Sequence, residues 1–201
     1  MIAREVLAIR ALSGLTHVSV TALPAMLHFQ PDRICDAVAS AAENARQAGA
    51  VDILVGYADC GTGGRLKALC ESRGLELLPG PHCFAIYGAE SGQVGVLNEV
   101  KDEPGAFYVT DFLARQPDAF LWRPLGLDRH PDLAATYFSN YRAVVHLAQT
   151  EDEALDRSAR EIARRLGLSY ERRATGYGAL PELLTAWAGG ASTTTRRGDG
   201  L

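Results

Sequence analysis

Six short runs of apolar and β-branched residues recur along this chain, and segments with helical periodicity separate them. The runs occupy residues 17–23, 51–57, 75–78, 106–110, 143–149 and 168–173. Two of the helical segments carry a clear apolar stripe, namely Ile34, Val38, Ala41 and Ala45 in residues 31–49, and Leu155, Ala159, Ile162 and Leu166 in residues 151–167. Strands that alternate with helices pair in parallel, because each helix carries the chain back across the sheet. The sequence therefore predicts an α/β fold with a mainly parallel sheet flanked by helices.

The chain has 201 residues, of which 47% are hydrophobic, so it can bury a core without disulfides or metal. We expect a single α/β domain over residues 1–188. Residues 51–80 and 143–176 share an order of strand, polar turn, helix, Gly-Leu and strand, which suggests two similar Rossmann-like halves, 1–105 and 106–188. The alternative is that any two strand–helix–strand units share this order. Residues 189–201 are small and polar and are predicted to be a disordered tail.

Charge, hydropathy and cysteine content indicate which partners and which cellular compartment to expect. The net charge is −4, and the basic residues are scattered, so we expect no nucleic-acid partner. No run of eighteen apolar residues occurs, which argues against a membrane span. Four cysteines without a secretory signal are typical of reduced thiols, so we expect a cytoplasmic protein.

The stretch YADCGTGG, residues 57–64, follows an apolar run and is the strongest candidate for a site. Asp59 and Cys60 stand at the end of the predicted strand. Behind them comes a glycine-rich turn into a helix, formed by Gly61, Thr62, Gly63, Gly64 and Arg65. Such a turn presents backbone N–H groups that attract an anion, or that lower the pKa of a thiol and make Cys60 a nucleophile. The alternative is a tight strand-to-helix turn with a small buried thiol.

The loop GPHCF presents a second thiol and an imidazole between two prolines and an aromatic residue. Cys83 and His82, together with Asp59 and Cys60, would suit zinc or the iron of an iron–sulfur cluster. The chain has no Cys-x-x-Cys, so such a metal site must be assembled from separate segments. The alternative is that Cys83 is a core residue and His82 caps a turn.

Further polar residues stand at strand ends or in loops. Asp111 follows the run 106–110, and ligands collect beyond the carboxyl ends of parallel strands, so we expect it to converge with Cys60 on one edge of the sheet as a catalytic candidate. His130 lies beside Asp128 and is a candidate for acid–base chemistry; an ion-paired turn is the alternative. Gly176 and Gly178 permit a helix start that receives an anion, or only a connection. His17, His146, Cys35 and Cys70 are expected to be structural.

These motifs together resemble the domain-of-unknown-function family 1638. The resemblance is carried by AREVLAI, YADCGTGG, GPHCF, EPGAFYVTDFLAR, GLDRHPDL, YFSNYRAVVHLAQT and TGYG. The family has no established activity. Its members are often encoded beside corrinoid-dependent methyltransferase components, which implies those components as partners and a supporting role in one-carbon metabolism. Members also carry a strand with a third cysteine ahead of the ARE helix. Here MIAREV lacks it, so the first family strand is expected to be missing.

Three hypotheses follow. The first is a metal or iron–sulfur centre held by Cys60 and Cys83, with Asp59 or His82 assisting, that supports corrinoid-dependent methyl transfer. The second is a thiol enzyme in which Cys60 is the nucleophile and Arg65 or His82 supports it. The third is a non-catalytic accessory module that binds a nucleotide, a corrinoid or a protein.

Overall fold

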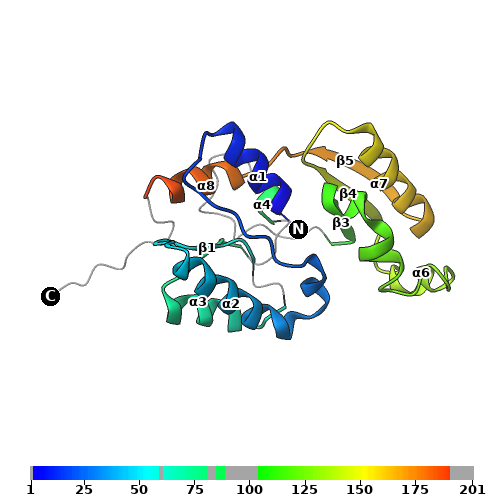
Figure 1. The fold of residues 1–201 in the computed structure, drawn as a ribbon. Helices are drawn as coiled ribbons and strands as arrows, with labels where there is room; N and C mark the ends of the chain where they lie inside the picture. Colours follow the sequence, from blue (N-terminus) through cyan, green and yellow to red (C-terminus); the bar gives the residue numbers. More distant parts are fainter. Residues whose placement is uncertain (1, 59–60, 81–84, 89–103, 191–201) are drawn as a thin grey trace. The chain divides into compact units, whose positions relative to one another are not determined.

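In the computed structural model the described strands form two parallel sheets with helices alongside, which confirms the α/β fold. The structure describes residues 2–58, 61–80, 85–88 and 104–190. The chain divides into two compact units (Figure 1). The first comprises residues 1–98 and 179–201, and the second comprises residues 99–178.

The first unit places a short parallel strand pair between helices. Its elements are α1 (Ala3–Leu12), the 3-10 turns η1 (Ala25–Phe29) and η2 (Pro31–Arg33), α2 (Ile34–Gln47), β1 (Leu54–Val55), α3 (Arg65–Arg73), β2 (Glu76–Leu77), α4 (Ala85–Gly88) and α8 (Leu180–Ala188). Helices α2 and α3 pack together on one side of β1, and α1 and α8 pack together on the other (Figure 1). The core of this unit consists of Leu27, Ile34, Val38, Ala42, Val55, Leu66, Cys70 and Leu75.

The second unit is built on a three-stranded parallel sheet. Its elements are β3 (Ala106–Thr110), α5 (Asp111–Arg115), the π-helical turn η4 (Asp118–Trp122), α6 (Leu133–Tyr137), β4 (Ala143–Ala148), α7 (Glu153–Leu166) and β5 (Ser169–Ala174). The strand order is β3-β4-β5. In the register of the sheet, Val144 in the central strand lies opposite Phe107 and Tyr170.

Helix α7 illustrates how the sequence specifies this unit. The Asp152 carboxylate caps the helix by accepting hydrogen bonds from the N–H groups of Ala154 and Leu155, and Gly167 ends it in the left-handed conformation with φ of 71°. The predicted stripe Leu155, Ala159, Ile162 and Leu166 is buried against the sheet. The predicted strands 106–110, 143–149 and 168–173 match β3, β4 and β5 to within a residue at each end.

The prediction of a strand at residues 17–23 is wrong. The side-chain alternation exists, because Val18 and Val20 are half-buried while His17 and Ser19 are exposed. What the segment lacks is a neighbour, since no strand among the described residues pairs with it. A strand forms only where a partner accepts its hydrogen bonds. The predicted run 51–57 is likewise reduced to the two residues of β1, which pairs with β2 alone among the described strands.

Candidate functional site

The residues expected to hold a metal follow β1 and β2 in the first unit. Asp59, Cys60, His82 and Cys83 all lie outside the described residues. The strands that precede them are described: β1 and β2 pair in parallel, with Val55 opposite Leu77. The chain therefore leaves both strands at the same edge of the pair, on its way to Cys60 and to Cys83.

The glycine-rich turn 61–64 needs its glycines for backbone conformation. Gly61, Gly63 and Gly64 have φ angles of 81°, 62° and 83°, a region that residues with a β-carbon rarely adopt. Gly64 directly precedes α3 in this left-handed conformation. The turn therefore bends the chain sharply from the end of β1 into α3, as the sequence predicted for these positions.

Thr62 joins this turn to the start of α3 through hydrogen bonds. Its side chain is buried, and its hydroxyl oxygen accepts a hydrogen bond from the N–H of Leu66 at 3.3 Å. Its carbonyl oxygen accepts from Arg65, both from the backbone N–H at 3.3 Å and from Nε at 3.0 Å. Two N–H groups at the start of α3 and one guanidinium N–H are thus already engaged within the turn. The anion-binding role of this turn and of Arg65 stays a prediction.

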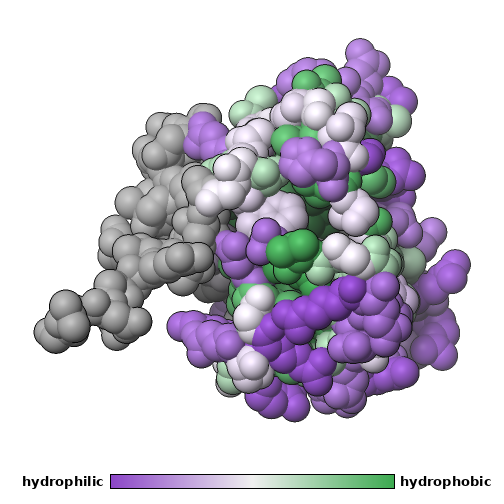
Figure 2. Space-filling model, turned by 60° about the vertical axis from the view of Figure 1, so that its left-hand side comes forward, coloured by the Kyte–Doolittle hydropathy of each residue, from purple (hydrophilic) through white to green (hydrophobic). Residues whose placement is uncertain are grey.

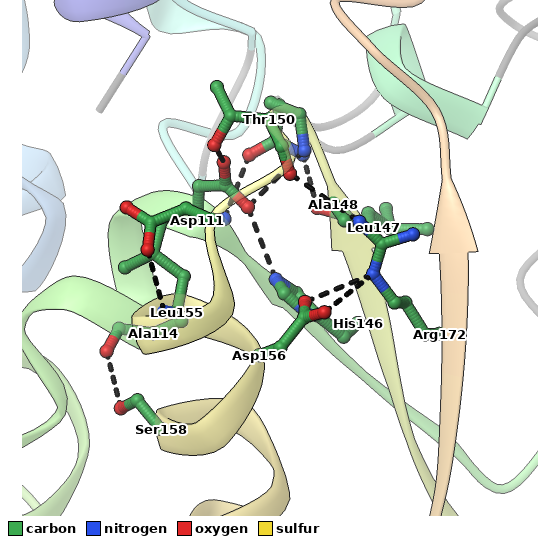
Figure 3. Close-up of polar contacts among 12 residues, drawn as sticks. Asp111, Ala114, His146, Leu147, Ala148, Thr150, Leu155, Asp156, Ser158 and Arg172 are labelled. Atoms are coloured by element: carbon green, nitrogen blue, oxygen red, sulfur yellow. Dashed lines mark hydrogen bonds and ion pairs between the residues drawn. The ribbon is translucent and has the colours of Figure 1, made fainter.

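A buried polar network occupies the carboxyl ends of β3 and β4 in the second unit (Figure 3). Asp111, the first residue of α5, is 1% exposed, and His146 in β4 is fully buried. The Asp111 carboxylate accepts hydrogen bonds from His146 Nε2 at 3.1 Å, from the Gln149 N–H at 3.2 Å and from the Thr150 hydroxyl at 2.6 Å. The Asp111 N–H donates in turn to Gln149 Oε1 at 2.8 Å, so the ends of β3 and β4 are joined in both directions.

The other ring nitrogen of His146 faces α7 and β5. Its Nδ1 lies 3.2 Å from the Tyr170 hydroxyl and 3.3 Å from Asp156 Oδ1. Arg172 donates to the Asp156 carboxylate through Nε at 3.0 Å and to Glu151 at 2.8 Å. The His146 ring therefore links β4 to Asp111 at the start of α5, to Asp156 in α7 and to Tyr170 in β5.

The protonation of this network follows from its donors. Burial alone would raise the pKa of Asp111, but the hydrogen bonds from His146, Thr150 and the Gln149 N–H outweigh burial and hold its pKa below the usual value. Asp111 is thus ionised at neutral pH, and His146 must carry hydrogen on Nε2. The Tyr170 hydroxyl lies within hydrogen-bond distance of the other ring nitrogen, Nδ1, and can donate to it.

Burial decides what this network can do chemically. Neither Asp111 nor His146 reaches solvent, so neither can contact a substrate in this conformation. Thr150 is exposed, and the Asp156 and Arg172 side chains are 25% and 23% exposed. The network therefore holds the sheet and α7 together, and its two solvent-facing ends are Thr150 and the Asp156–Arg172 pair.

The sequence placed Cys60 and Asp111 on one edge of one sheet, but the described strands form two sheets. Segment 59–60 follows β1, whereas Asp111 follows β3, which belongs to the other sheet. Asp111 shares its edge with Gln149 and Thr150. Sequence reasoning missed Asp156, Tyr170 and Arg172. The available signal was His146, the one hydrophilic residue in the strand AVVHLA, because a buried imidazole needs hydrogen-bond partners.

The remaining predicted residues lie in turns of the second unit. His130 is exposed, and within the described residues no hydrogen bond or ion pair joins its ring to Asp128. Gly176 and Gly178 have φ angles of 53° and 54° in the turn that follows β5. In the same turn, Thr175 donates its backbone N–H to the carbonyl of Ala148 at 3.0 Å. Their catalytic and anion-binding roles stay predictions.

The two described cysteines are free thiols in the first unit. Cys70 is 2% exposed, as the core interpretation predicted, and burial raises its pKa. Cys35 packs at the edge of the same core. In the part of the chain that the structure describes, no group of three or more His, Cys, Asp or Glu residues is arranged to hold a metal ion. No helix in that part is long and apolar enough to cross a membrane.

Comparison with known proteins gives one match. A family model described as "Protein of unknown function (DUF1638)" matches residues 22–184, which is most of the chain. No curated protein and no solved structure matches. The matched range includes the glycine-rich turn, both segments that follow β1 and β2, and the whole Asp111–His146 network.

Proposed function

The chain belongs to the DUF1638 family of proteins of unknown function, and on that premise we propose that it binds a metal ion or an iron–sulfur centre through Cys60 and Cys83 in support of corrinoid-dependent methyl transfer. The observation that carries this proposal is the parallel pairing of β1 with β2. Cys60 follows Val55 by five residues and Cys83 follows Leu77 by six, and Val55 and Leu77 are register partners.

Chain length supports a meeting of the two thiols. Paired strands lie about 4.8 Å apart, and each residue of extended chain spans at most about 3.5 Å. Segments of five and six residues that leave adjacent strands at one edge are therefore long enough to bring Cys60 and Cys83 to one centre. Thiolates are the ligands that zinc and iron–sulfur clusters prefer, and Asp59 and His82 offer an oxygen and a nitrogen beside them.

The glycine-rich turn supports the same centre. Gly61 directly follows Cys60 and, like Gly63, adopts a positive φ, so the backbone can pass close to the metal without a β-carbon in the way. Backbone N–H groups near thiolate sulfur stabilise its negative charge and tune a cluster. The corrinoid methyltransferase partners and the cytoplasmic location belong to the proposal. The genes that neighbour other family members support the first, and the free thiols of Cys35 and Cys70 support the second.

The test is the metal and acid-labile sulfide content of protein purified without oxygen. We expect stoichiometric zinc, or iron with sulfide, and we expect Cys60→Ser and Cys83→Ser to lose it. Cys35→Ser is the matched control, because Cys35 lies on α2 and should leave the metal content unchanged. Protein without metal, or metal retained in both variants, contradicts the proposal. In that case a single thiol that reacts rapidly with iodoacetamide and disappears in Cys60→Ser would identify a thiol enzyme instead.

A further inference from the structure

Strand β5 forms one edge of the sheet in the second unit, and β4 is its only partner among the described strands. Its first residue, Ser169, donates its N–H to the Arg142 carbonyl at 3.1 Å, and Thr175, just beyond its last residue, donates to the Ala148 carbonyl at 3.0 Å. Successive residues in a parallel pair direct their N–H and C=O groups to alternate sides. The main-chain groups that point away from β4 are therefore those of Tyr170, Arg172 and Ala174.

These outward groups of β5 have no hydrogen-bond partner in the described part of the chain. Along the strand, Ser169, Glu171 and Ala174 are exposed. An unpaired strand edge is a template for a further strand, and charged side chains are one device that keeps wrong strands away from it. The charges on β5 therefore decide which strand the edge can accept.

The charges of β5 favour a second copy of the same strand in one register. Two copies related by a two-fold axis pair antiparallel, and the outward groups of one must face those of the other. When the pairing is centred on Arg172, Glu171 lies opposite the partner's Arg173. A centre one residue away, at Glu171 or at Arg173, places two like charges directly opposite each other, which is destabilising.

We propose that this chain forms a two-fold dimer in which β5 pairs antiparallel with β5 of a second copy, in the register centred on Arg172. Each pair of outward-facing residues then exchanges two main-chain hydrogen bonds. Glu171 and the partner's Arg173 occupy the positions between these pairs, where the Cα atoms of opposite residues are about 4.5 Å apart. The dimer joins the two sheets edge to edge.

The side chains of Glu171 and Arg173 suit this register. Arg173 Nε donates to Glu171 Oε1 at 2.6 Å within one chain, and the two side chains are 34% and 50% exposed, respectively. Because side chains alternate along a strand, both lie on the face of the sheet opposite Tyr170 and Arg172, whose side chains contact α7 and its residues. The two-fold axis brings two such pairs together as a neutral group of four charges.

The side chains on the α7 face also fit. Arg172 lies opposite the partner's Arg172, but its charge is balanced within its own chain, because it donates to Asp156 at 3.0 Å and to Glu151 at 2.8 Å. Tyr170 lies opposite the partner's Ala174, whose small side chain leaves room for the ring. Neither contact therefore opposes the register that the Glu171–Arg173 pairs favour.

The test is the association constant of the full chain, measured by sedimentation equilibrium. We expect the wild type to form dimers, and we expect Glu171→Arg and Arg173→Glu each to weaken dimerisation by roughly tenfold or more, because each places like charges opposite each other. The matched control is Glu71→Arg, which makes the same change of charge in the exposed Lys67–Glu71 pair on α3 and should leave dimerisation unchanged.

A mixture of the two variants tests the register itself. The Glu171→Arg chain carries arginine at both positions and the Arg173→Glu chain carries glutamate at both, so a mixed dimer again has opposite charges in contact. We expect the one-to-one mixture to associate more tightly than either variant alone. Ala174→Pro removes an outward N–H while leaving the pairing with β4 intact, and it should also weaken the dimer.

Three outcomes would overturn the proposal. A wild type that stays monomeric would show that the edge of β5 does not accept a second copy. Dimers that persist in both charge-reversal variants would place the interface elsewhere, for example at the hollow in which hydrophobic residues gather in Figure 2. A mixture that associates no more tightly than its two components would show that Glu171 and the partner's Arg173 do not face each other.

Discussion

Removal of the Asp111 carboxylate should destabilise the second unit strongly. In Asp111→Ala the His146 Nε2–H, the Thr150 hydroxyl and the Gln149 N–H lose their common acceptor, and His146 is fully buried. A buried hydrogen-bonding group left without a partner costs about 1–3 kcal/mol. The exposed Thr150 can turn to water, so two buried donors remain, the His146 Nε2–H and the Gln149 N–H. We expect a loss of about 2–5 kcal/mol in the free energy of unfolding.

Two further variants serve as references for the size of this loss in the free energy of unfolding. Asp111→Asn keeps one oxygen acceptor but loses the charge, so we expect a smaller loss of about 1–3 kcal/mol. Asp128→Ala removes an exposed carboxylate from the same unit and should change stability by less than about 0.5 kcal/mol. The assay is urea unfolding followed by the fluorescence of Trp122, which is buried in the core of the second unit, in a Trp187→Phe background. Equal losses for Asp111→Ala and Asp128→Ala would refute the reasoning.

Three more predictions concern pH and the glycine-rich turn. The pKa of Asp111 is lower in the folded protein than in the unfolded chain, so its stabilising effect should be complete above the unfolded pKa of about 3.9. The effect should vanish as pH falls through the folded value. Urea unfolding between pH 7 and pH 2 should therefore show that the difference in stability between wild type and Asp111→Asn shrinks only at the acid end. Gly64→Ala should cost about 1 kcal/mol because φ is 83° there, while Gly64→Asn should cost less, as thermal unfolding can measure. Thr62→Val leaves the Leu66 N–H without its acceptor and should lower stability by about 1–3 kcal/mol, whereas Thr62→Ser should retain most of it.

Local signals made the second unit predictable. The stripe of α7, its Asp152 cap and the final Gly167 all lie within one short stretch of sequence, and each acts through its near neighbours. The turn at 61–64 was also predictable from local sequence, because its clustered glycines indicated positive φ angles. Asp111 was identified because it directly follows a parallel strand, and ligand-binding residues lie beyond the carboxyl ends of such strands.

Longer-range features were not available from the sequence. The partners of His146 come from α5, α7 and β5, so no local pattern could pair them. The segment 17–23 has strand-like alternation, but a strand also needs a hydrogen-bonded neighbour, and no strand among the described residues supplies one. The division of the strands into two sheets also escaped prediction, because periodicity identifies strands without saying which of them pair.

The central claim is that Cys60 and Cys83 bind one metal centre beyond the edge of the β1–β2 pair. X-ray absorption at the metal edge, recorded on the protein loaded with zinc, tests this most directly. The account predicts a sulfur shell at about 2.3 Å that corresponds to two thiolates in the wild type and to one in Cys60→Ser or Cys83→Ser. A first shell made of nitrogen and oxygen alone, or a sulfur shell unchanged in both variants, would contradict it.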